Sequence, residues 1–288
     1  MIKCSLIHIS SQTLGVIGKE LRIMKISLSS AVSGLRSHQI KMDVIGNNVA
    51  NVNTNGFKSS NVSFADLYNQ TIGNSQNGNP MQVGSGAFVS GVSVNTASSG
   101  MVATGSALDI HINGNGFLIT QNSNSEMFYT RSGTLNFDAA GSLVDSSGNF
   151  VLGWSGNNEE VGVITIDESL KGRITGISIG ANGEITGFVN NAQVSIGRIA
   201  VAQFSNPGGL YKSGSNNYSQ SPNSGEAMIS LPGNNGAGSF AAGYLEMSNV
   251  DMANESTGMI MTQRGFQANI RTITTTDEIL DELINIKR

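Results

Sequence analysis

The chain has 288 residues, of which 12% are charged and 36 are glycine, and its formal net charge is −4 at pH 7. A weakly negative chain without a basic cluster disfavours a nucleic-acid-binding protein. Every apolar run is shorter than a membrane span, and the lone Cys4 argues against a fold held by disulfides or by a thiolate metal site. The Gly-, Ser- and Asn-rich composition instead suits turn-rich β structure joined to helices.

Residues 1–23 do not share the pattern that begins at Met24. Gly18, Lys19 and Glu20 correspond to a purine-rich run of codons shortly before Met24, as in a bacterial ribosome-binding site that is translated by mistake. A targeting segment is the weaker interpretation, because no apolar core is followed by a small-residue cleavage site. We therefore expect residues 1–23 to be an extension upstream of a true start at Met24, which the intact mass of the protein would test.

A first amphipathic helix is predicted at 27–53, within a terminal segment that we place at 24–55. Its apolar stripe, in which Gln39 fills one position, consists of Leu28, Val32, Leu35, Met42, Ile45, Val49 and Val52. Gly34 and Gly46 weaken an isolated helix, but they allow a partner helix to approach closely. The stripe therefore predicts a helix that pairs with another helix.

Three asparagines, Asn47, Asn51 and Asn55, follow one another at four-residue spacing on one face of this helix. That spacing fits a solvated face and amide bonding between subunits equally well. Polar turn residues at 53–56 end the helix. Residues 56–86 are expected to form a connector.

Residues 87–248 predict a β-rich body. In one expected strand the apolar Leu108, Ile110 and Ile112 alternate with polar residues that include His111, so His111 is expected at the surface. The chain then turns at 113–116 into a second apolar strand. Two similar stretches that begin at Asp138 and Asp145 each predict an Asp-to-Gly turn before a strand. The polar passage 208–238 is expected to be extended on the surface.

The last segment, 249–288, predicts one long helix that starts near Asn249, with Ser248 and Asp251 in the pattern of a capping box. Every seventh residue forms an apolar row of Met252, Met259, Phe266, Ile273 and Leu280. A second, mixed row consists of Ser256, Gln263, Ile270, Asp277 and Ile284. The threonines at 272 and 274–276 favour a break, but the heptad frame passes through them. An amphipathic helix on its own domain is the alternative, and the matching stripe in the first helix favours assembly instead.

No catalytic, cofactor-binding or metal-binding set is predicted. The histidines His8, His38 and His111 lie far apart and lack metal-ligand spacing. The chain has no P-loop, no dinucleotide-binding glycine pattern between strand and helix, and no nucleophile with a supporting base. We therefore expect no cofactor and no enzymatic activity. A secreted β-domain enzyme or sugar-binding protein is the remote alternative, which a pocket with clustered titratable residues would favour.

Several stretches resemble the rod and hook proteins of the bacterial flagellum. They are residues 30–35 and 42–58 near the start, 107–117 and 129–133 in the middle, and 243–251 and 261–269 near the end. Together they extend the resemblance over residues 24–288. Residues 64–66, 264–269 and 273–280 are most similar to the hook protein. The missing outer domain of large hook proteins keeps a distal, basal-body rod protein as the alternative.

This resemblance implies a mixed, mainly β fold, in which the N- and C-terminal helices pair as a coiled-coil-like inner domain beside a β-rich central body. It implies a flagellar hook subunit that is exported by the type III apparatus and stacks with its copies into a helical tube, a flexible joint that transmits torque outside the cell. The implied partners are copies of itself, the rod, hook-cap and hook–filament junction proteins and the export apparatus, without nucleic acid or membrane insertion. The two stripes, from Leu28 to Val52 and from Met252 to Ile284, are the expected assembly interface.

Overall fold

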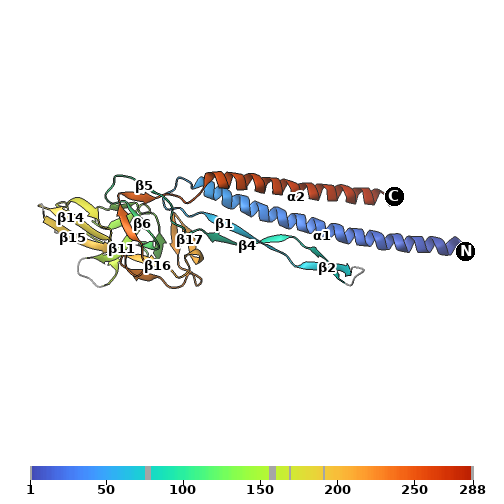
Figure 1. The fold of residues 1–288 in the computed structure, drawn as a ribbon, viewed down its shortest axis with the longest axis horizontal. Helices are drawn as coiled ribbons and strands as arrows, with labels where there is room; N and C mark the ends of the chain where they lie inside the picture. Colours follow the sequence, from blue (N-terminus) through green and yellow to red (C-terminus); the bar gives the residue numbers. More distant parts are fainter. Residues whose placement is uncertain (1, 75–78, 156–159, 169, 191, 287–288) are drawn as a thin grey trace. The chain divides into compact units, whose positions relative to one another are not determined.

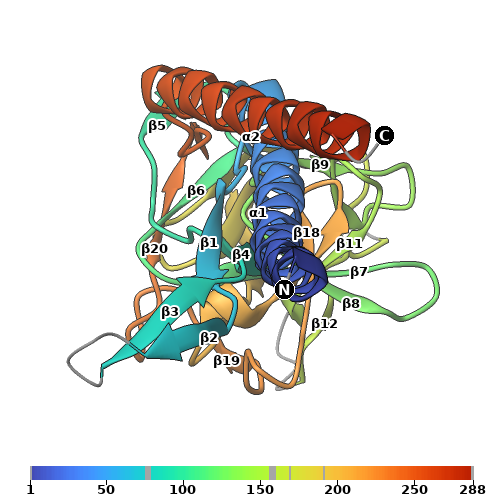
Figure 2. The same ribbon diagram turned by 90° about the vertical axis from the view of Figure 1, so that its right-hand side faces the viewer.

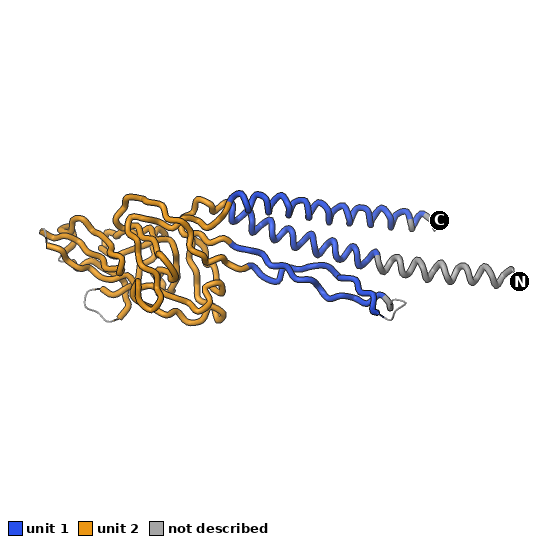
Figure 3. Tube along the Cα trace, in the orientation of Figure 1, with its two compact units in different colours: residues 1–49, 60–92, 252–288 blue, residues 50–59, 93–251 orange. Residues whose placement is uncertain are grey.

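The computed structural model describes residues 2–74, 79–155, 160–168, 170–190 and 192–286. Within these ranges it describes side chains from residue 24 onward, apart from those of residues 73, 74, 283 and 286. The side chains of the expected extension, with Cys4 and His8, therefore lie outside the described part. Two compact units are formed: unit 1 by Met1–Val49, Ser60–Val92 and Met252–Arg288, and unit 2 by Ala50–Ser59 and Ser93–Asp251 (Figure 3).

Unit 1 combines the two terminal helices with a β ribbon. Its elements are α1 (Ile2–Ala50), β1 (Ser60–Asp66), β2 (Asn69–Asn74), β3 (Pro80–Gly84), most of β4 (Ala87–Val94) and α2 (Met252–Ile286). Strand β1 pairs with β4, and β2 pairs with β3 in antiparallel fashion. Seen from two directions, α1 lies between α2 and the ribbon (Figures 1 and 2).

Helix α2 runs without a break through the threonine run, as the heptad frame predicted. Threonine hydroxyls there bond the carbonyls of the preceding turn, with Thr272 Oγ1 3.1 Å from Ala268 O and Thr276 Oγ1 2.6 Å from Thr272 O. This back-bonding satisfies the hydroxyls inside the helix. The helix begins at Met252, later than the predicted start near Asn249. The Oγ of Ser248 accepts a bond from Val250 N at 3.4 Å.

The segment 56–86, expected to be a connector, contains β1, β2 and β3. Every residue of β3 is exposed, and β1 has only exposed and half-buried residues. Apolar residues occur at every second position only over short stretches, Val62 and Phe64 in β1 and Met81 and Val83 in β3, too short to signal a strand by themselves. The first helix also differs from its prediction, because α1 ends at Ala50 and Thr54 N then bonds Asn51 O at 3.1 Å.

Unit 2 consists mainly of short strands. They are β5 (Met101–Ala103), β6 (Ile110–Asn113), β7 (Phe117–Gln121), β8 (Met127–Thr130), β9 (Leu135–Phe137), β10 (Leu143–Asp145), β11 (Phe150–Ser155), β12 (Gly162–Val163), β13 (Thr175–Ile179), β14 (Glu184–Val189), β15 (Ala192–Ile199), β16 (Val201–Gln203), β17 (Tyr211–Gly214), β18 (Asn217–Ser219), β19 (Met228–Ser230), β20 (Ser239–Ala242) and β21 (Tyr244–Glu246), with the short helix η1 (Pro207–Gly209). Among the described residues, one sheet holds 13 strands in the order β13-β14-β15-β11-β7-β8-β18-β17, with β9, β10, β12, β16 and β19 pairing beside this path. The pairs β20–β6 and β21–β5 stand outside it.

The central strands of unit 2 are covered on both faces. In β7, Leu118 belongs to one hydrophobic core, whereas its neighbours Phe117 and Ile119 belong to a second core. In β11, Val151 and Leu152 divide in the same way. Two-sided burial explains why these strands appear in the sequence as continuous apolar runs.

The two predicted Asp-to-Gly turns are confirmed. Ser142 N donates to Asp138 Oδ1 at 2.7 Å, and Asn149 N donates to Asp145 Oδ1 at 2.9 Å. Each turn contains a glycine at positive φ, +81° at Gly141 and +82° at Gly148. The aspartates therefore hold turns, through the side-chain bonding that favours Asp there.

The predicted turn at 113–116 does lead into the apolar strand β7, although β6 pairs with β20 and not with β7. Two other expectations for unit 2 are wrong. His111 is only 5% exposed, because β6 is covered on both faces. The passage 208–238 contributes strands β17, β18 and β19, and Tyr218 within it is buried. These pairings join segments far apart in the chain, and local patterns do not report them.

Candidate functional site

In unit 1, α1 and α2 form an antiparallel pair with a constant register. The contacts that define it join Asn48 with Glu255, Ile45 with Gly258, His38 with Gly265, and Gly34 with Asn269. Each step along α1 is matched by an equal step back along α2. The predicted pairing of the terminal helices is therefore present within one chain.

The α2 side of this pair uses one of the two predicted rows. Met259, Phe266, Ile273 and Leu280 of the apolar row are half-buried, whereas Met252 at its start is 47% exposed. The second row is displaced by one residue from its prediction: the row that faces α1 consists of Glu255, Thr262, Asn269 and Thr276. Thr262 is 2% exposed, while Ile270 and Ile284 of the predicted row are exposed. The prediction chose the row with Ile270 and Ile284 because it contains apolar residues. The row of Glu255 and Thr262 has the same seven-residue spacing, so spacing alone does not distinguish the two rows.

The predicted stripe of α1 has a graded exposure. Ile45 is buried, and half-buried positions are Leu28, Leu35, Met42, Val49 and Val52. Val32 is 36% exposed. The stripe therefore keeps accessible apolar surface in the single chain, and its assignment to an assembly interface stays a prediction.

Glycines allow the two helices to approach closely. A Cβ atom at Gly265 would lie 2.7 Å from the His38 ring, and one at Gly34 would lie 2.8 Å from Asn269 Nδ2. A side chain at either glycine would force the Asn269 amide or the His38 ring to move. Gly46, in contrast, has nothing within 4 Å of its would-be Cβ. The expected role of glycine in close approach is thus met at Gly34 and not at Gly46.

Asn48, which no sequence pattern distinguished, is the polar centre of unit 1. It is 1% exposed. Its Oδ1 accepts from Ser60 N at 2.9 Å, and its Nδ2 donates to Ser60 O at 2.9 Å and to Glu255 Oε1 at 2.9 Å. One amide thereby links α1, β1 and α2. The four-residue spacing in the sequence belongs to Asn47, Asn51 and Asn55, and Asn48 lies outside that pattern.

On its other side, α1 contacts the ribbon. Ser37 Oγ donates to Ala87 O at 3.2 Å. The centroid of the Phe64 ring lies 6.2 Å from the centroid of the His38 ring and 5.6 Å from Lys41 Nζ. Because of these contacts, β1 and β4 are fixed on α1 by both polar and aromatic side chains.

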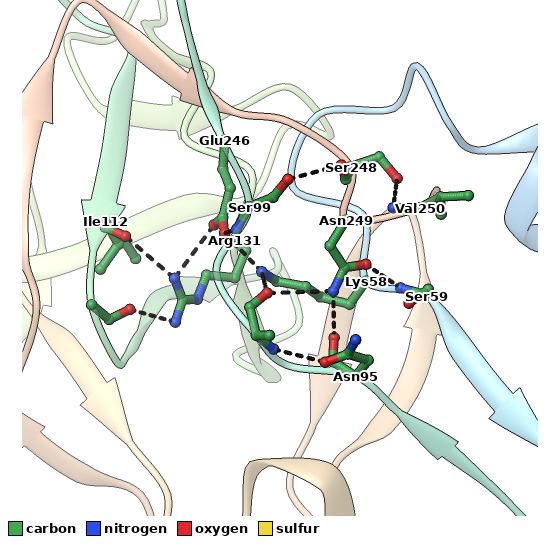
Figure 4. Close-up of polar contacts among 12 residues, drawn as sticks. Lys58, Ser59, Asn95, Ser99, Ile112, Arg131, Glu246, Ser248, Asn249 and Val250 are labelled. Atoms are coloured by element: carbon green, nitrogen blue, oxygen red, sulfur yellow. Dashed lines mark hydrogen bonds and ion pairs between the residues drawn. The ribbon is translucent and has the colours of Figure 1, made fainter. Parts of the chain in front are cut away.

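Unit 2 contains a buried cluster of three charges (Figure 4). Lys58 Nζ lies 2.7 Å from Glu246 Oε1, and Arg131 Nη1 lies 3.4 Å from Glu246 Oε2. Exposure is 0% for Lys58, 1% for Glu246 and 4% for Arg131. Glu246 Oε1 also accepts from Ser99 N at 3.1 Å, and Arg131 Nη2 donates to Gly114 O at 2.8 Å. These bonds compensate for part of the cost of removing the charges from water.

The pKa values in this cluster follow from burial and mutual attraction. Burial alone raises the pKa of Glu246, but the charge of Arg131 and the bond and charge of Lys58 outweigh it, so the pKa lies below its usual value. Burial lowers the pKa of Lys58, and Glu246 opposes that shift. Burial also lowers the pKa of His111, whose Nδ1 has no hydrogen-bond partner among the described residues. The cluster stabilises an ionised Glu246.

The cluster joins three of the stretches that carried the family resemblance. Lys58 ends the stretch 42–58, Arg131 lies in 129–133, and Glu246 lies in 243–251. Glycines of these stretches also lie close against backbone atoms of distant segments. A Cβ at Gly56, where φ is +71°, would lie 2.8 Å from Arg131 C, and one at Gly133 would collide with Ile110 O. The separate motifs therefore form one structural joint.

The cluster has the features of a structural joint, because its charged groups bond each other and backbone atoms. Two pockets in the described part of the chain lie along α1 in unit 1. Over the described ranges, no group of three or more His, Cys, Asp or Glu side chains is arranged to hold a metal ion. None of the helices in the described part of the chain is long and apolar enough to cross a membrane.

Family comparisons cover the beginning, middle and end of the chain. Residues 28–58 match the model "Flagella basal body rod protein", residues 111–187 match "Flagellar hook protein FlgE/F/G D1 domain", and residues 241–286 match "Flagellar basal body rod FlgEFG protein C-terminal". The three matches contain Lys58, Arg131 and Glu246 respectively. The residues of the buried cluster therefore come from all three matched regions.

Similar proteins include both rod and hook proteins. The flagellar basal-body rod protein FlgG of Bacillus subtilis (strain 168) is 41% identical over 273 residues, which cover 91% of this chain and 99% of the relative. In Borreliella burgdorferi, the rod protein FlgG is 32% identical, covering 91% of this chain and 98% of that protein. The hook protein FlgE of the same organism is 27% identical over 439 residues, covering 91% of this chain and 99% of that protein. The chain therefore belongs to the family of flagellar rod and hook proteins, structural proteins of the bacterial flagellum.

Proposed function

We propose that this chain is a structural subunit of the flagellar basal-body rod. The observation that carries the proposal is the 41% identity to a rod protein along 99% of that protein. Alignments to hook proteins of Borreliella burgdorferi and Treponema pallidum are 27% identical and extend over 439 and 461 residues, more than the whole of this chain. The relatives thus favour the rod over the hook, which the sequence motifs placed first.

Self-assembly is the proposed way in which the chain acts. Unit 1 buries one side of each terminal helix in the helix pair and leaves Val32, Ile40, Ile270 and Ile284 exposed. Exposed apolar side chains on paired helices suit contacts with further copies. We place the helices in the inner wall of a tube and the β body of unit 2 in the outer wall, as the resemblance implies.

The proposed partners follow from a position in the axial structure. They are other copies of the chain, neighbouring rod proteins, and the export apparatus that delivers the subunit. A hook subunit, with the hook cap and hook–filament junction proteins as neighbours, is the second candidate. Its support is the similarity of residues 264–269 and 273–280 to hook proteins and the matches to hook relatives over 99% of their length.

Electron microscopy of basal bodies from a strain that lacks this gene separates the candidates. We expect basal bodies without a complete rod, and normal basal bodies when the gene is returned on a plasmid. Complete rods without hooks would overturn the rod proposal in favour of the hook. Intact flagella would contradict both. The control is the deletion strain that carries the gene on a plasmid with the change Glu126→Gln, at an exposed position of unit 2. This control should form normal basal bodies.

A further inference from the structure

An apolar groove runs along α1 on the side that carries the ribbon. It has a volume of about 600 Å³. Its apolar lining comes from Leu28, Val32 and Ile40 of α1 and from Leu67, Phe88 and Val89 next to or within the ribbon. Val32, Ile40 and Phe88 are 36%, 41% and 45% exposed. Helix α2 of the same chain contributes no residue to this lining, since α2 lies on the other side of α1 (Figure 2).

The rim of the groove is basic. Lys25 and Arg36 line it and are exposed. From residue 24 to residue 42, the chain has the basic residues Lys25, Arg36 and Lys41 and no acidic residue. The two ion pairs among the described residues join Lys58 and Arg131 to Glu246 in unit 2. Neither Lys25 nor Arg36 therefore has an ion-pair partner among the described residues. A suitable occupant is therefore apolar and acidic.

Helix α2 carries a surface with these properties. Ile270, Thr274, Asp277, Asp281 and Ile284 follow one another at steps of four and three residues, so they form a stripe on one face. All are exposed, with Ile270 at 39% and Ile284 at 64%. This stripe lies beside the row that faces α1 and takes no part in the helix pair described above. From residue 272 to residue 286, α2 has four acidic residues, Asp277, Glu278, Asp281 and Glu282, and no basic one.

The lengths of the two surfaces also agree. The groove follows α1 from Lys25 to Ile40, about 22 Å at 1.5 Å per residue. The stripe on α2 runs from Ile270 to Ile284, about 21 Å by the same rise. The terminal isoleucines would lie on the apolar lining of the groove, while Asp277 and Asp281 between them would meet the basic rim.

We propose that the groove on α1 receives the Ile270–Ile284 stripe on α2 of a second copy of this chain. Groove and stripe are different surfaces of one molecule, so each copy offers one and receives the other. Such a heterologous contact continues from copy to copy into an open polymer. The inference rests on the proposed self-assembly and identifies the surfaces that carry it.

Charge reversal on each surface tests this contact. The groove variant carries Lys25→Glu and Arg36→Glu, and the stripe variant carries Asp277→Lys and Asp281→Lys. Each variant alone places like charges in the contact, so it should lose the polymers that the wild type forms in sedimentation and electron microscopy at low ionic strength. A mixture of the two variants should regain polymers, because the acidic groove now meets a basic stripe and the basic groove meets an acidic one.

Two matched controls change the same charges elsewhere. Glu278→Lys with Glu282→Lys alters neighbouring positions of α2 outside the stripe, and Arg264→Glu with Arg271→Glu does so with the opposite sign. All four positions are exposed. Both controls should polymerise like the wild type. Helical circular dichroism of every variant should match the wild type, which confirms that unit 1 has kept its helices.

The outcomes separate this inference from the proposed function. Failure of the purified wild type to associate at high concentration would count against self-assembly itself. Polymers from either charge-reversed variant alone would overturn the groove contact and leave self-assembly standing. Rescue only when all four changes share one chain, without rescue in the mixture, would mean that these charges pair within a chain and would also overturn it.

Discussion

Lys58 and Glu246 are 188 positions apart in the chain, yet Lys58 Nζ lies 2.7 Å from Glu246 Oε1 and both side chains are fully buried. Lys58 follows α1 in the sequence, and Glu246 precedes α2. The pair therefore ties together the two ends of unit 2 from which the chain continues into the terminal helices. Backbone atoms support it, with Gly56 N donating to Glu246 O at 2.8 Å.

Replacing Glu246 by Gln should destabilise unit 2 strongly. The change removes the carboxylate shared by Lys58 and Arg131, and two buried cations are left without their counter-charge. Breaking a buried pair from one side costs roughly 3–5 kcal/mol. Urea unfolding followed by Trp154 fluorescence measures the loss of free energy. Glu126→Gln, at an exposed position, is the control, and a loss as small as that of the control would contradict a structural role for the cluster.

The stability of unit 2 should fall as the pH drops from about 7 to 5. Burial lowers the pKa of His111, Glu246 opposes the shift, and Arg131 and Lys58 add to it. Since the folded pKa is below the unfolded value of about 6.5, the unfolded chain binds the proton first, and stability is lost from that pH downward. Glu246, with its lowered pKa, acts in a separate window, because its contribution is lost only as the pH falls below about 4.3.

Thermal unfolding of the wild type and of His111→Gln at several pH values checks this expectation. The variant should lose less of its melting temperature over the histidine window. His38, whose pKa is also lowered by burial, belongs to unit 1, so His38→Gln is the matched comparison. Equal pH dependence in the wild type and in His111→Gln would show that His111 does not govern the effect.

Alanine at two glycines should have opposite effects on unit 1. Gly46→Ala should stabilise α1 by up to about 1 kcal/mol, because alanine favours the helix and its Cβ meets nothing within 4 Å. Gly265→Ala should destabilise the helix pair, since the new Cβ would lie 2.7 Å from the His38 ring. Hydrogen exchange of α2 amides measures both changes. Faster exchange in Gly46→Ala, or slower exchange in Gly265→Ala, would contradict the described register.

Aspartate at two neighbouring isoleucines of α2 should separate assembly from folding. Ile270→Asp alters an exposed position of the stripe, so the helix pair should form normally while polymers fail to assemble. Ile273→Asp places a carboxylate in the half-buried apolar row of Met259 and Phe266, so the helix pair should weaken. Limited proteolysis of α2 reports the pair, and sedimentation reports polymers. Normal polymers from Ile270→Asp would remove that residue from any assembly contact.

Several features could be predicted because they depend on local chemistry. The heptad frame predicted that α2 continues through its threonines, and the turns at Asp138 and Asp145 followed from side-chain bonds to the next few backbone amides. The apolar row that contains Met259 and Phe266 was placed correctly on the partly buried side of α2. In each case the interacting groups lie within one or two turns of chain.

Other features became visible only in three dimensions. Asn48 and His111 are polar residues in otherwise ordinary patterns, and their burial depends on segments that pack over them. The choice between the row of Glu255 and Thr262 and the row of Ser256 and Ile270 also depended on α1, because both rows fit one heptad. Periodicity shows which residues share a face of a helix, but it does not show which face meets a partner.

The amino-acid sequence by itself determined the two terminal helices, the β-rich region between them and the family resemblance, because periodic patterns and short motifs are properties of neighbouring residues. Only the tertiary structure decided that Lys58, Arg131 and Glu246 meet, that α1 and α2 pair through glycines, and that the stripe from Ile270 to Ile284 stays exposed. All three features depend on contacts between segments that are distant in the sequence. These contacts are stabilised by burial and charge pairing, which exist only after the chain has folded.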